Sequence, residues 1–288
     1  MDNITALDKA TKNKKTIDAI LNILRYLVLT IWLVFAVFPL FWMFICSLKS
    51  DAEVVSTVFN FTPTISNYAI VLFRPDSNYI KAFLQNFVVS GGAILVTIIA
   101  GVPAAYAFAR YDFKNKETWA FQILSFKFAP EILVILPIFM IFQRLGLYDT
   151  YFGLIWVYQL ITMPLLIWVV RGYFEDISVE VEQAAQLDGY TWYEVFFRIL
   201  LPLIKPGLVA ASLLAFIFAW NSFTFPLILS GVRVQTITIT SLRFLASDSV
   251  HYGQVAVAAI IAVLPEIVIC LFIQKHLVRG LSFGAVKG

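Results

Sequence analysis

Residues 22–48 read NILRYLVLTIWLVFAVFPLFWMFICSL, an apolar stretch of 27 residues with a single charged side chain, Arg25. A helix needs about 20 apolar residues to cross the hydrocarbon core of a bilayer, so this stretch is long enough to span a membrane. Five similar windows follow, at 83–109, 119–143, 152–170, 204–229 and 254–274. Lipid offers no hydrogen bonds to the backbone, and long runs without alternation do not suit barrel strands. The sequence therefore predicts an all-α, polytopic membrane protein with six transmembrane helices.

The composition excludes several classes of protein. Hydrophobic residues make up 60% of the 288 residues and charged residues 14%, whereas soluble domains have about 45–50% and about 25%. The mean hydropathy is +0.85. A soluble globule with this composition would expose large apolar patches and aggregate. A soluble enzyme, a nucleic-acid-binding module and a disordered chain are therefore excluded, and no nucleic-acid partner is expected.

Positive charges predict the orientation of the spans, because Lys and Arg are retained on the cytoplasmic side. With the N-terminus inside, cytoplasmic segments hold 14 of the 21 Lys and Arg residues, external loops hold six, and Lys127 lies within a span. We therefore expect both termini to be cytoplasmic. The expected domains are a cytoplasmic N-terminal segment (1–21), a membrane domain (22–277) and a cytoplasmic tail (278–288).

The loop at 171–203 is longer than two neighbouring spans require, and its pattern predicts two short helices joined by a turn. Ser178 can cap the first helix and Gly189 can end it with a positive φ. Thr191 and Glu194 have the spacing of a capping box that begins the second helix.

Two proline residues, Pro202 and Pro206, are expected to end that second helix. Two interpretations of the loop stay open on physical grounds. A rigid helix pair can be gripped by a partner protein, or an amphipathic segment with Trp192 and Phe197 can lie on the membrane surface.

The same loop carries a resemblance to a known family. Gln183-Ala184-Ala185-Gln186-Leu187-Asp188-Gly189, followed after nine residues by Ile199-Leu200-Leu201-Pro202, is similar to the cytoplasmic signature of the membrane subunits of ABC importers. That signature has Glu-Ala-Ala, three residues, Gly, nine residues and Ile-x-Leu-Pro. The chain departs from it at Gln183, where the family has Glu. If the family's Glu contacts the ATPase, that contact is weakened here or is made by the preceding residue, Glu182.

Further segments resemble the carbohydrate branch of these importers, and in particular the second permease of the maltose and multiple-sugar transporters. They are 63–68, 103–110 (PAAYAFAR), 145–154 (LGLYDTYFGL) and the C-terminal 280–288 (GLSFGAVKG). The resemblance implies the type I importer permease fold and a location in the bacterial cytoplasmic (inner) membrane. It also implies a second permease subunit, two cytoplasmic ATP-binding-cassette subunits and an extracytoplasmic solute-binding protein.

The resemblance further assigns roles to individual residues. Residues expected to couple the chain to the ATPase are Glu182, Gln183, Ala184, Ala185, Asp188, Gly189 and Pro202. In the tail, Phe283 and Lys287 are expected to contact the ATPase subunits; the alternative is a frayed, solvated terminus.

No catalytic machinery is recognisable in the sequence. The pattern Gly-x4-Gly-Lys-Ser/Thr does not occur, so ATP and Mg are expected on the partner subunits and no cofactor on this chain. The two histidines, His251 and His276, are assigned to opposite sides of the membrane, so no metal site is expected. The chain is therefore interpreted as a non-catalytic membrane subunit.

Polar residues inside the spans are the candidates for the translocation path, because burying them in lipid is costly. Lys127 and Glu131 are four residues apart and can neutralise each other on one helix face. The alternatives are a polar wall of the path and a self-paired structural bridge. Glu266, beside Pro265, has the same two alternatives, the structural one being a contact with the partner permease or a neighbouring span.

Hydroxyl, amide and aromatic groups suit a sugar, because sugars are bound by hydrogen bonds and by stacking on aromatic rings. Candidates of this kind are Gln159, Thr162, Trp220, Asn221, Ser222 and Thr224. The alternative role of these side chains is to hold helices together.

These observations predict one half of a heteromeric pore for ATP-driven import of a sugar, with an oligosaccharide as the expected substrate class. Two alternatives are a secondary transporter driven by an ion gradient and an ABC permease for a solute that is not a sugar. A secondary transporter is typically built from internal repeats, which are not clear in this sequence.

The orientation can be tested by cysteine labelling in intact cells. Single cysteines at Lys14, Lys116 and Lys287 should be shielded from an impermeant thiol reagent, because these positions are expected inside. Cysteines at Asn67 and Ser249 should react. External labelling at position 116 would contradict the six-span topology.

Overall fold

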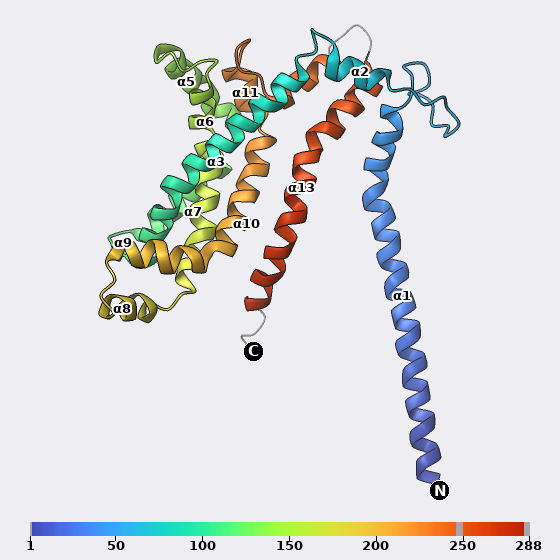
Figure 1. Cartoon of the computed structure of the whole chain (residues 1–288), viewed down its shortest axis with the longest axis vertical. Helices are drawn as coiled ribbons and strands as arrows, with labels where there is room; N and C mark the ends of the chain where they lie inside the picture. The colour runs from blue at the N-terminus through green and yellow to red at the C-terminus, as the bar shows by residue number, and fades with distance from the viewer. Residues whose placement is uncertain (1, 246–249, 285–288) are drawn as a thin grey trace.

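The computed structural model describes the backbone of residues 2–245 and 250–284, and the side chains of 17–245 and 250–272. All regular elements in these ranges are helices, which confirms the all-α prediction (Figure 1). The α-helices are α1 (Asp2–Ser47), α2 (Ser66–Phe73), α3 (Tyr79–Arg110), α4 (Lys116–Ser125), α5 (Glu131–Arg144), α6 (Tyr151–Val157), α7 (Gln159–Glu175), α8 (Val179–Leu187), α9 (Trp192–Glu194), α10 (Leu201–Trp220), α11 (Thr224–Leu229), α12 (Ile237–Ser241) and α13 (Tyr252–Gly284). Short turns of other helix types are η1 (Phe126–Phe128), η2 (Val195–Leu200) and η3 (Leu242–Phe244).

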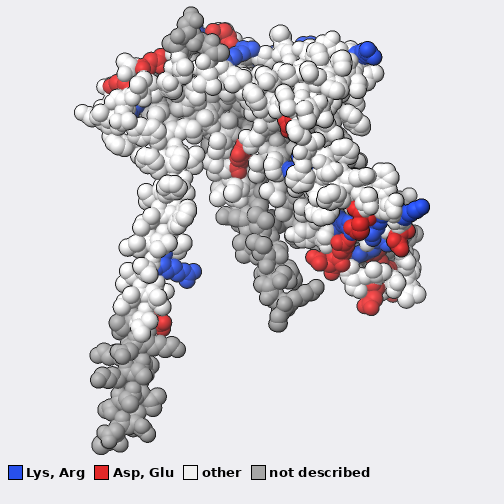
Figure 2. Space-filling view, turned by 180° about the vertical axis from the view of Figure 1, so that it is seen from behind, with Lys and Arg blue, Asp and Glu red and all other residues white. Residues whose placement is uncertain are grey.

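Six segments have the length and apolar character of membrane spans. Four are unbroken helical stretches, at 17–47, 79–110, 192–220 and 252–272. The other two are bent pairs, 116–128 with 131–144 and 151–157 with 159–175, bent by 93° and 43°. Figure 2 shows most charged side chains near the two ends of the molecule, with a largely uncharged band between them. This is the distribution that a membrane-spanning bundle requires.

The helix α3 lies at the centre of the bundle and packs against α7 and α10. Small residues allow close approach: a Cβ added at Gly207 of α10 would overlap the ring of Tyr173 on α7. Polar bonds add to this packing. The Thr97 hydroxyl on α3 lies 2.7 Å from both the Gln159 and Thr162 side chains of α7.

The first span stands apart from the others. None of the apolar window in 17–47 is buried, and α1 approaches α13 only near its C-terminal end (Figure 1). Helix α1 begins, and α13 ends, on the same side of the bundle as α8. A helix that is apolar all round and contacts so little of its own chain has its whole surface available to lipid or to another subunit.

Three of the predicted spans are not single straight helices: the third and the fourth are the bent pairs, and the fifth is interrupted near its end. The third span bends sharply after Phe128. Pro130 disfavours a helical conformation at the residue before it, Ala129, which is extended. The fifth span was predicted over 204–229. Its first helix, α10, ends at Trp220, and a second helix, α11, begins at Thr224.

The expectation that Pro202 and Pro206 end the second loop helix is wrong. The helix runs without interruption from Trp192 to Trp220 through both prolines. The widened π-helical turn Val195–Leu200 precedes Pro202, which occupies the first turn of α10. Proline has no backbone N–H to donate. It is tolerated at this position because the first turn of an α-helix, here preceded by a wider turn, does not need that hydrogen bond.

On the side of the bundle opposite α8, Asp149 holds two loops together. It has a φ of 55°, and its carboxylate accepts hydrogen bonds from the backbone N–H groups of Gly231, Arg233 and Val234 at 2.8–2.9 Å. Partial burial acts to raise the pKa of Asp149, but these N–H donors stabilise the charged form more strongly, so its pKa lies below the usual value.

Replacing this carboxylate should destabilise the fold in a pH-dependent way. Asp149→Asn should lower the free energy of unfolding by about 1–3 kcal/mol near neutral pH, because hydrogen bonds to a charged acceptor are lost. The lowered pKa makes the stabilisation complete above about pH 4, the usual pKa of Asp, and removes it as the pH falls further. Thermal unfolding in detergent should therefore separate variant from wild type at neutral pH and bring them together in acid. The exposed Asp112→Asn is the control, and a pH-independent difference for Asp149→Asn would contradict this account.

Candidate functional site

The 171–203 loop forms the expected helix–turn–helix. The Ser178 hydroxyl caps α8 by accepting a bond from the N–H of Glu180. After α8 the N–H groups of Gly189 and Tyr190 bond back to the carbonyls of Gln186 and Ala185, and Gly189 has a φ of +89°. This is a Schellman ending, which favours glycine because a side chain is strained at positive φ.

The second helix of the loop begins as predicted. Thr191 and Glu194 form a capping box in which each side chain bonds the backbone N–H of the other. Both helix ends are therefore fixed by local bonds, and the loop presents α8 in one defined orientation at an end of the bundle (Figure 1).

One face of α8 is buried against the same chain. Glu182 and Ala185 are only 7% and 6% exposed. The Glu182 carboxylate accepts hydrogen bonds from Tyr106 and Arg110 of α3, and Ala185 belongs to the core that includes Phe174. The expectation that Glu182 takes over an ATPase contact, and that Ala185 faces a partner, is therefore wrong. The helical period turns these two residues inward.

The opposite face of α8 and its end are exposed. Gln183, Ala184, Asp188 and Gly189 lie there as predicted candidates. Leu187, which we did not single out, is 89% exposed. The sequence could have indicated this exposed position. Leu187 is three residues after Ala184 and four after Gln183, so all three share a helix face. Pro202 is also exposed, at the start of α10.

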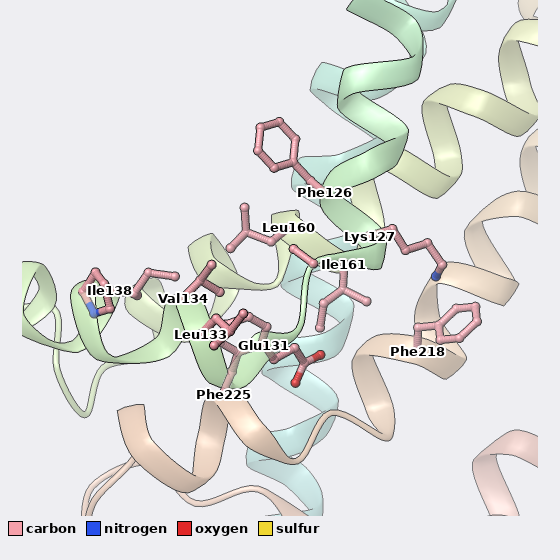
Figure 3. Close-up of a pocket in the computed structure, with 12 residues that line it drawn as sticks. Phe126, Lys127, Glu131, Leu133, Val134, Ile138, Leu160, Ile161, Phe218 and Phe225 are labelled. Carbon is pink, nitrogen blue, oxygen red and sulfur yellow. The ribbon is translucent and has the colours of Figure 1, made fainter.

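A pocket of about 520 Å³ lies between the bend of the third span and the break of the fifth (Figure 3). Lys127 and Glu131 line it from the third span, and Phe218 and Phe225 from the fifth. Figure 3 shows the Lys127 side chain extended toward the Phe218 ring, with the Glu131 carboxylate apart from it. The Lys127 Nζ lies 3.4 Å from the centroid of that ring.

The predicted pairing of Lys127 with Glu131 is wrong for the described structure, in which neither side chain forms an ion pair. Lys127 lies in η1 and Glu131 begins α5, so the 93° bend separates residues that a straight helix would have placed on one face. The pocket thus holds a lysine and a glutamate that do not neutralise each other directly.

The remaining polar candidates separate into two groups. Asn221 is exposed and donates a hydrogen bond to Glu266 on α13 at 2.8 Å, beside the break in the fifth span. Ser222 is buried within the break, and Thr224 is half-buried at the start of α11.

Trp220, Gln159 and Thr162 connect helices. Trp220 is 1% exposed and donates to the Ala262 carbonyl, while Gln159 and Thr162 bond to α3. These contacts are those of the structural alternative. Phe283 lies in α13, with its side chain outside the described part, and Lys287 lies outside the described residues.

No group of three or more metal-ligating side chains occurs among the described residues. The described residues form contact surfaces and a lined pocket.

Comparison with known proteins agrees with this geometry. Residues 9–283 match the family described as "Binding-protein-dependent transport system inner membrane component". The trehalose transport system permease protein SugB of Mycobacterium tuberculosis is 34% identical, with 88% of this chain and 93% of SugB covered. The trehalose/maltose transport system permease protein MalG of Thermococcus litoralis is 30% identical over the same shares of the two chains.

Among solved structures, the fold is similar to a chain of a bacterial ABC transporter involved in the import of the acidic polysaccharide alginate. The TM-score is 0.71 at 23% identity, with 90% of this chain and 96% of that chain covered. The family match covers nearly the whole chain, including all six spans and the α8 loop. The chain therefore belongs to the family of inner membrane components of binding-protein-dependent transport systems, the permease subunits of ABC importers.

Proposed function

We propose that this chain is one of two different permease subunits of an ATP-driven importer for a sugar, with an oligosaccharide as its substrate. The relatives named for trehalose, for trehalose and maltose, and for diacetylchitobiose support a carbohydrate. ATP and Mg bind to separate ATPase subunits. The family match supports this function and not a secondary transporter.

The observation that carries the proposal is the rigid, exposed face of α8. A leucine that is 89% exposed at the end of a capped helix is an apolar contact ready for a pocket in a partner. We assign Gln183, Ala184, Leu187, Asp188 and Gly189 to the ATPase contact. In this arrangement the side of the bundle that holds α8 is cytoplasmic, together with the start of α1 and the end of α13.

The other partners occupy other surfaces. The unburied α1 packs on the second permease. A span of 31 residues with so little contact to its own chain gains close helix–helix packing only against another subunit. The solute-binding protein docks on the side opposite α8, where Asp149 joins the loops. The sugar passes between the two permeases, beside the pocket of Lys127 and Glu131.

The α8 contact can be tested by substitutions that leave the chain's own core untouched. Ala184→Trp and Leu187→Asp should each lower co-purification of the ATPase subunits about tenfold or more, which corresponds to about 1.4 kcal/mol. The first adds bulk to the exposed face, and the second puts a charge where an apolar side chain is buried in the complex. Membrane insertion should be unchanged.

Val232→Asp is the matched control, because Val232 is 84% exposed and lies after α11, on the side opposite α8. Full ATPase recovery with Leu187→Asp and Ala184→Trp would show that this face of α8 is not the contact. Ala185→Trp is a poor probe, since Ala185 is buried in the chain's own core.

The pocket can be tested by sugar uptake. Lys127→Met removes the charge at similar length and should lower the uptake rate about tenfold, because the path loses its one cationic hydrogen-bond donor at this bend. ATPase co-purification should stay at the wild-type level. Phe121→Leu, an exposed position of α4 outside the pocket, is the control. Uptake by Lys127→Met at the wild-type rate and KM would remove Lys127 from the path.

A further inference from the structure

A buried ion pair joins the end of α3 to α8. Arg110 is the last residue of α3, and its Nε donates to Glu182 Oε1 while both side chains are only 9% exposed. Its second donor, Nη2, binds the Ile177 carbonyl at 2.9 Å, in the segment that precedes α8. One guanidinium group therefore holds both the entry to α8 and the helix itself. Separating such a pair strands a charge in a poorly solvated site, so the two elements resist being pulled apart.

Tyr106, one turn earlier on α3, makes the second connection. Its hydroxyl donates to Glu182 Oε2 at 2.9 Å and accepts a bond from Trp192 Nε1 at 3.2 Å. The Tyr106 ring also packs edge-on against Phe196 at 5.3 Å between centroids. The end of α3 thus binds residues before, within and after the helix–turn of the loop, and both oxygens of the Glu182 carboxylate are engaged inside the chain.

The other end of α3 is bound just as specifically, to the break in the fifth span and to the loop that follows α11. Asn86 donates to the carbonyl of Trp220, the last residue of α10, at 3.2 Å. Gln85 donates to the Arg233 carbonyl at 2.7 Å and accepts from the N–H of Gln235 at 3.0 Å. The 32 residues of α3 are about 48 Å long at 1.5 Å per residue. A single helix therefore connects the α8 loop with the break near the pocket.

We propose that α3 transmits movement of the α8 loop to the break in the fifth span, and that Glu182 and Arg110 are the positioning pair that makes α3 and α8 move as one body. This inference rests on the proposed function, because the movement originates in the ATPase that binds the outer face of α8. Glu182 acts through Arg110 and Tyr106 and does not touch the ATPase. A packed element held by directed bonds at both ends shifts as a unit, which is how a small displacement at one site reaches another.

The test uses the complete importer reconstituted in vesicles, with this chain carrying Glu182→Gln, Arg110→Gln or both. Each single variant should keep the ATPase subunits bound and hydrolysing ATP, while the sugar taken up per ATP falls about tenfold, within the usual range of coupling free energies. The double variant removes both charges at once and leaves no stranded ion. It should lose no more coupling than either single variant, because the two residues act as one unit. Tyr106→Phe, which keeps the ring, should give a smaller loss in the same direction.

Asp176→Asn is the matched control, since it removes one exposed charge from the same loop without removing a side-chain bond. Unchanged uptake per ATP in both the double variant and Tyr106→Phe would overturn the inference, as would losses that multiply in the double variant. Release of the ATPase by Glu182→Gln would also overturn it, by showing that Glu182 contacts the ATPase directly. If Leu187→Asp releases the ATPase while these variants behave as wild type, the proposed function holds and this inference fails. If the wild-type chain binds no ATPase, both fail.

Discussion

The absence of hydrogen-bond partners in the bilayer core is the constraint on which the rest of this structure depends. Each span satisfies its backbone within a helix, because an unpaired N–H or C=O in lipid costs several kcal/mol. Irregular backbone is tolerated only where it is buried in protein or lines a cavity. The bend after Phe128 and the break after Trp220 lie around one pocket, where α5, α10 and α11 meet. The same rule that makes the spans helical thus favours placing these two interruptions where a path can form.

The same solvent explains which surfaces lack partners within the chain. Lipid tails are as apolar as leucine, so burial of apolar area does not drive helices together in a membrane. The bundle around α3 is held instead by close approach at Gly207 and by the Thr97, Gln159 and Thr162 hydroxyl and amide groups. Helix α1 has few such features and lies apart. Its exposure, and a lysine that faces an aromatic ring across a pocket, suit one subunit of a larger assembly.

The short helix α8 has a buried face and an exposed face, because its helical period separates them. Residues 182 and 185 are buried in the chain's own core, where Glu182 bonds to α3, whereas 183, 184 and 187 are exposed. In the proposed complex, a push by the ATPase on the outer face of α8 reaches α3 through the inner face. The Ser178 cap at its start and the Schellman turn at Gly189 at its end hold α8 in its helical form.

The sequence by itself determined the number and class of the spans, the turn at Gly189 and the caps at Ser178 and Thr191, because these depend on local composition and on bonds a few residues apart. The family followed from the motif in the same loop. Only the tertiary structure decided that Glu182 binds Arg110, that Ala185 is buried, and that Lys127 contacts Phe218 instead of Glu131. Those outcomes depend on which face of a helix meets a segment more than 70 residues away and on a bend that the apolar pattern does not reveal. A periodicity shows that a helix has faces, but only the neighbours that pack against it decide which face is inside.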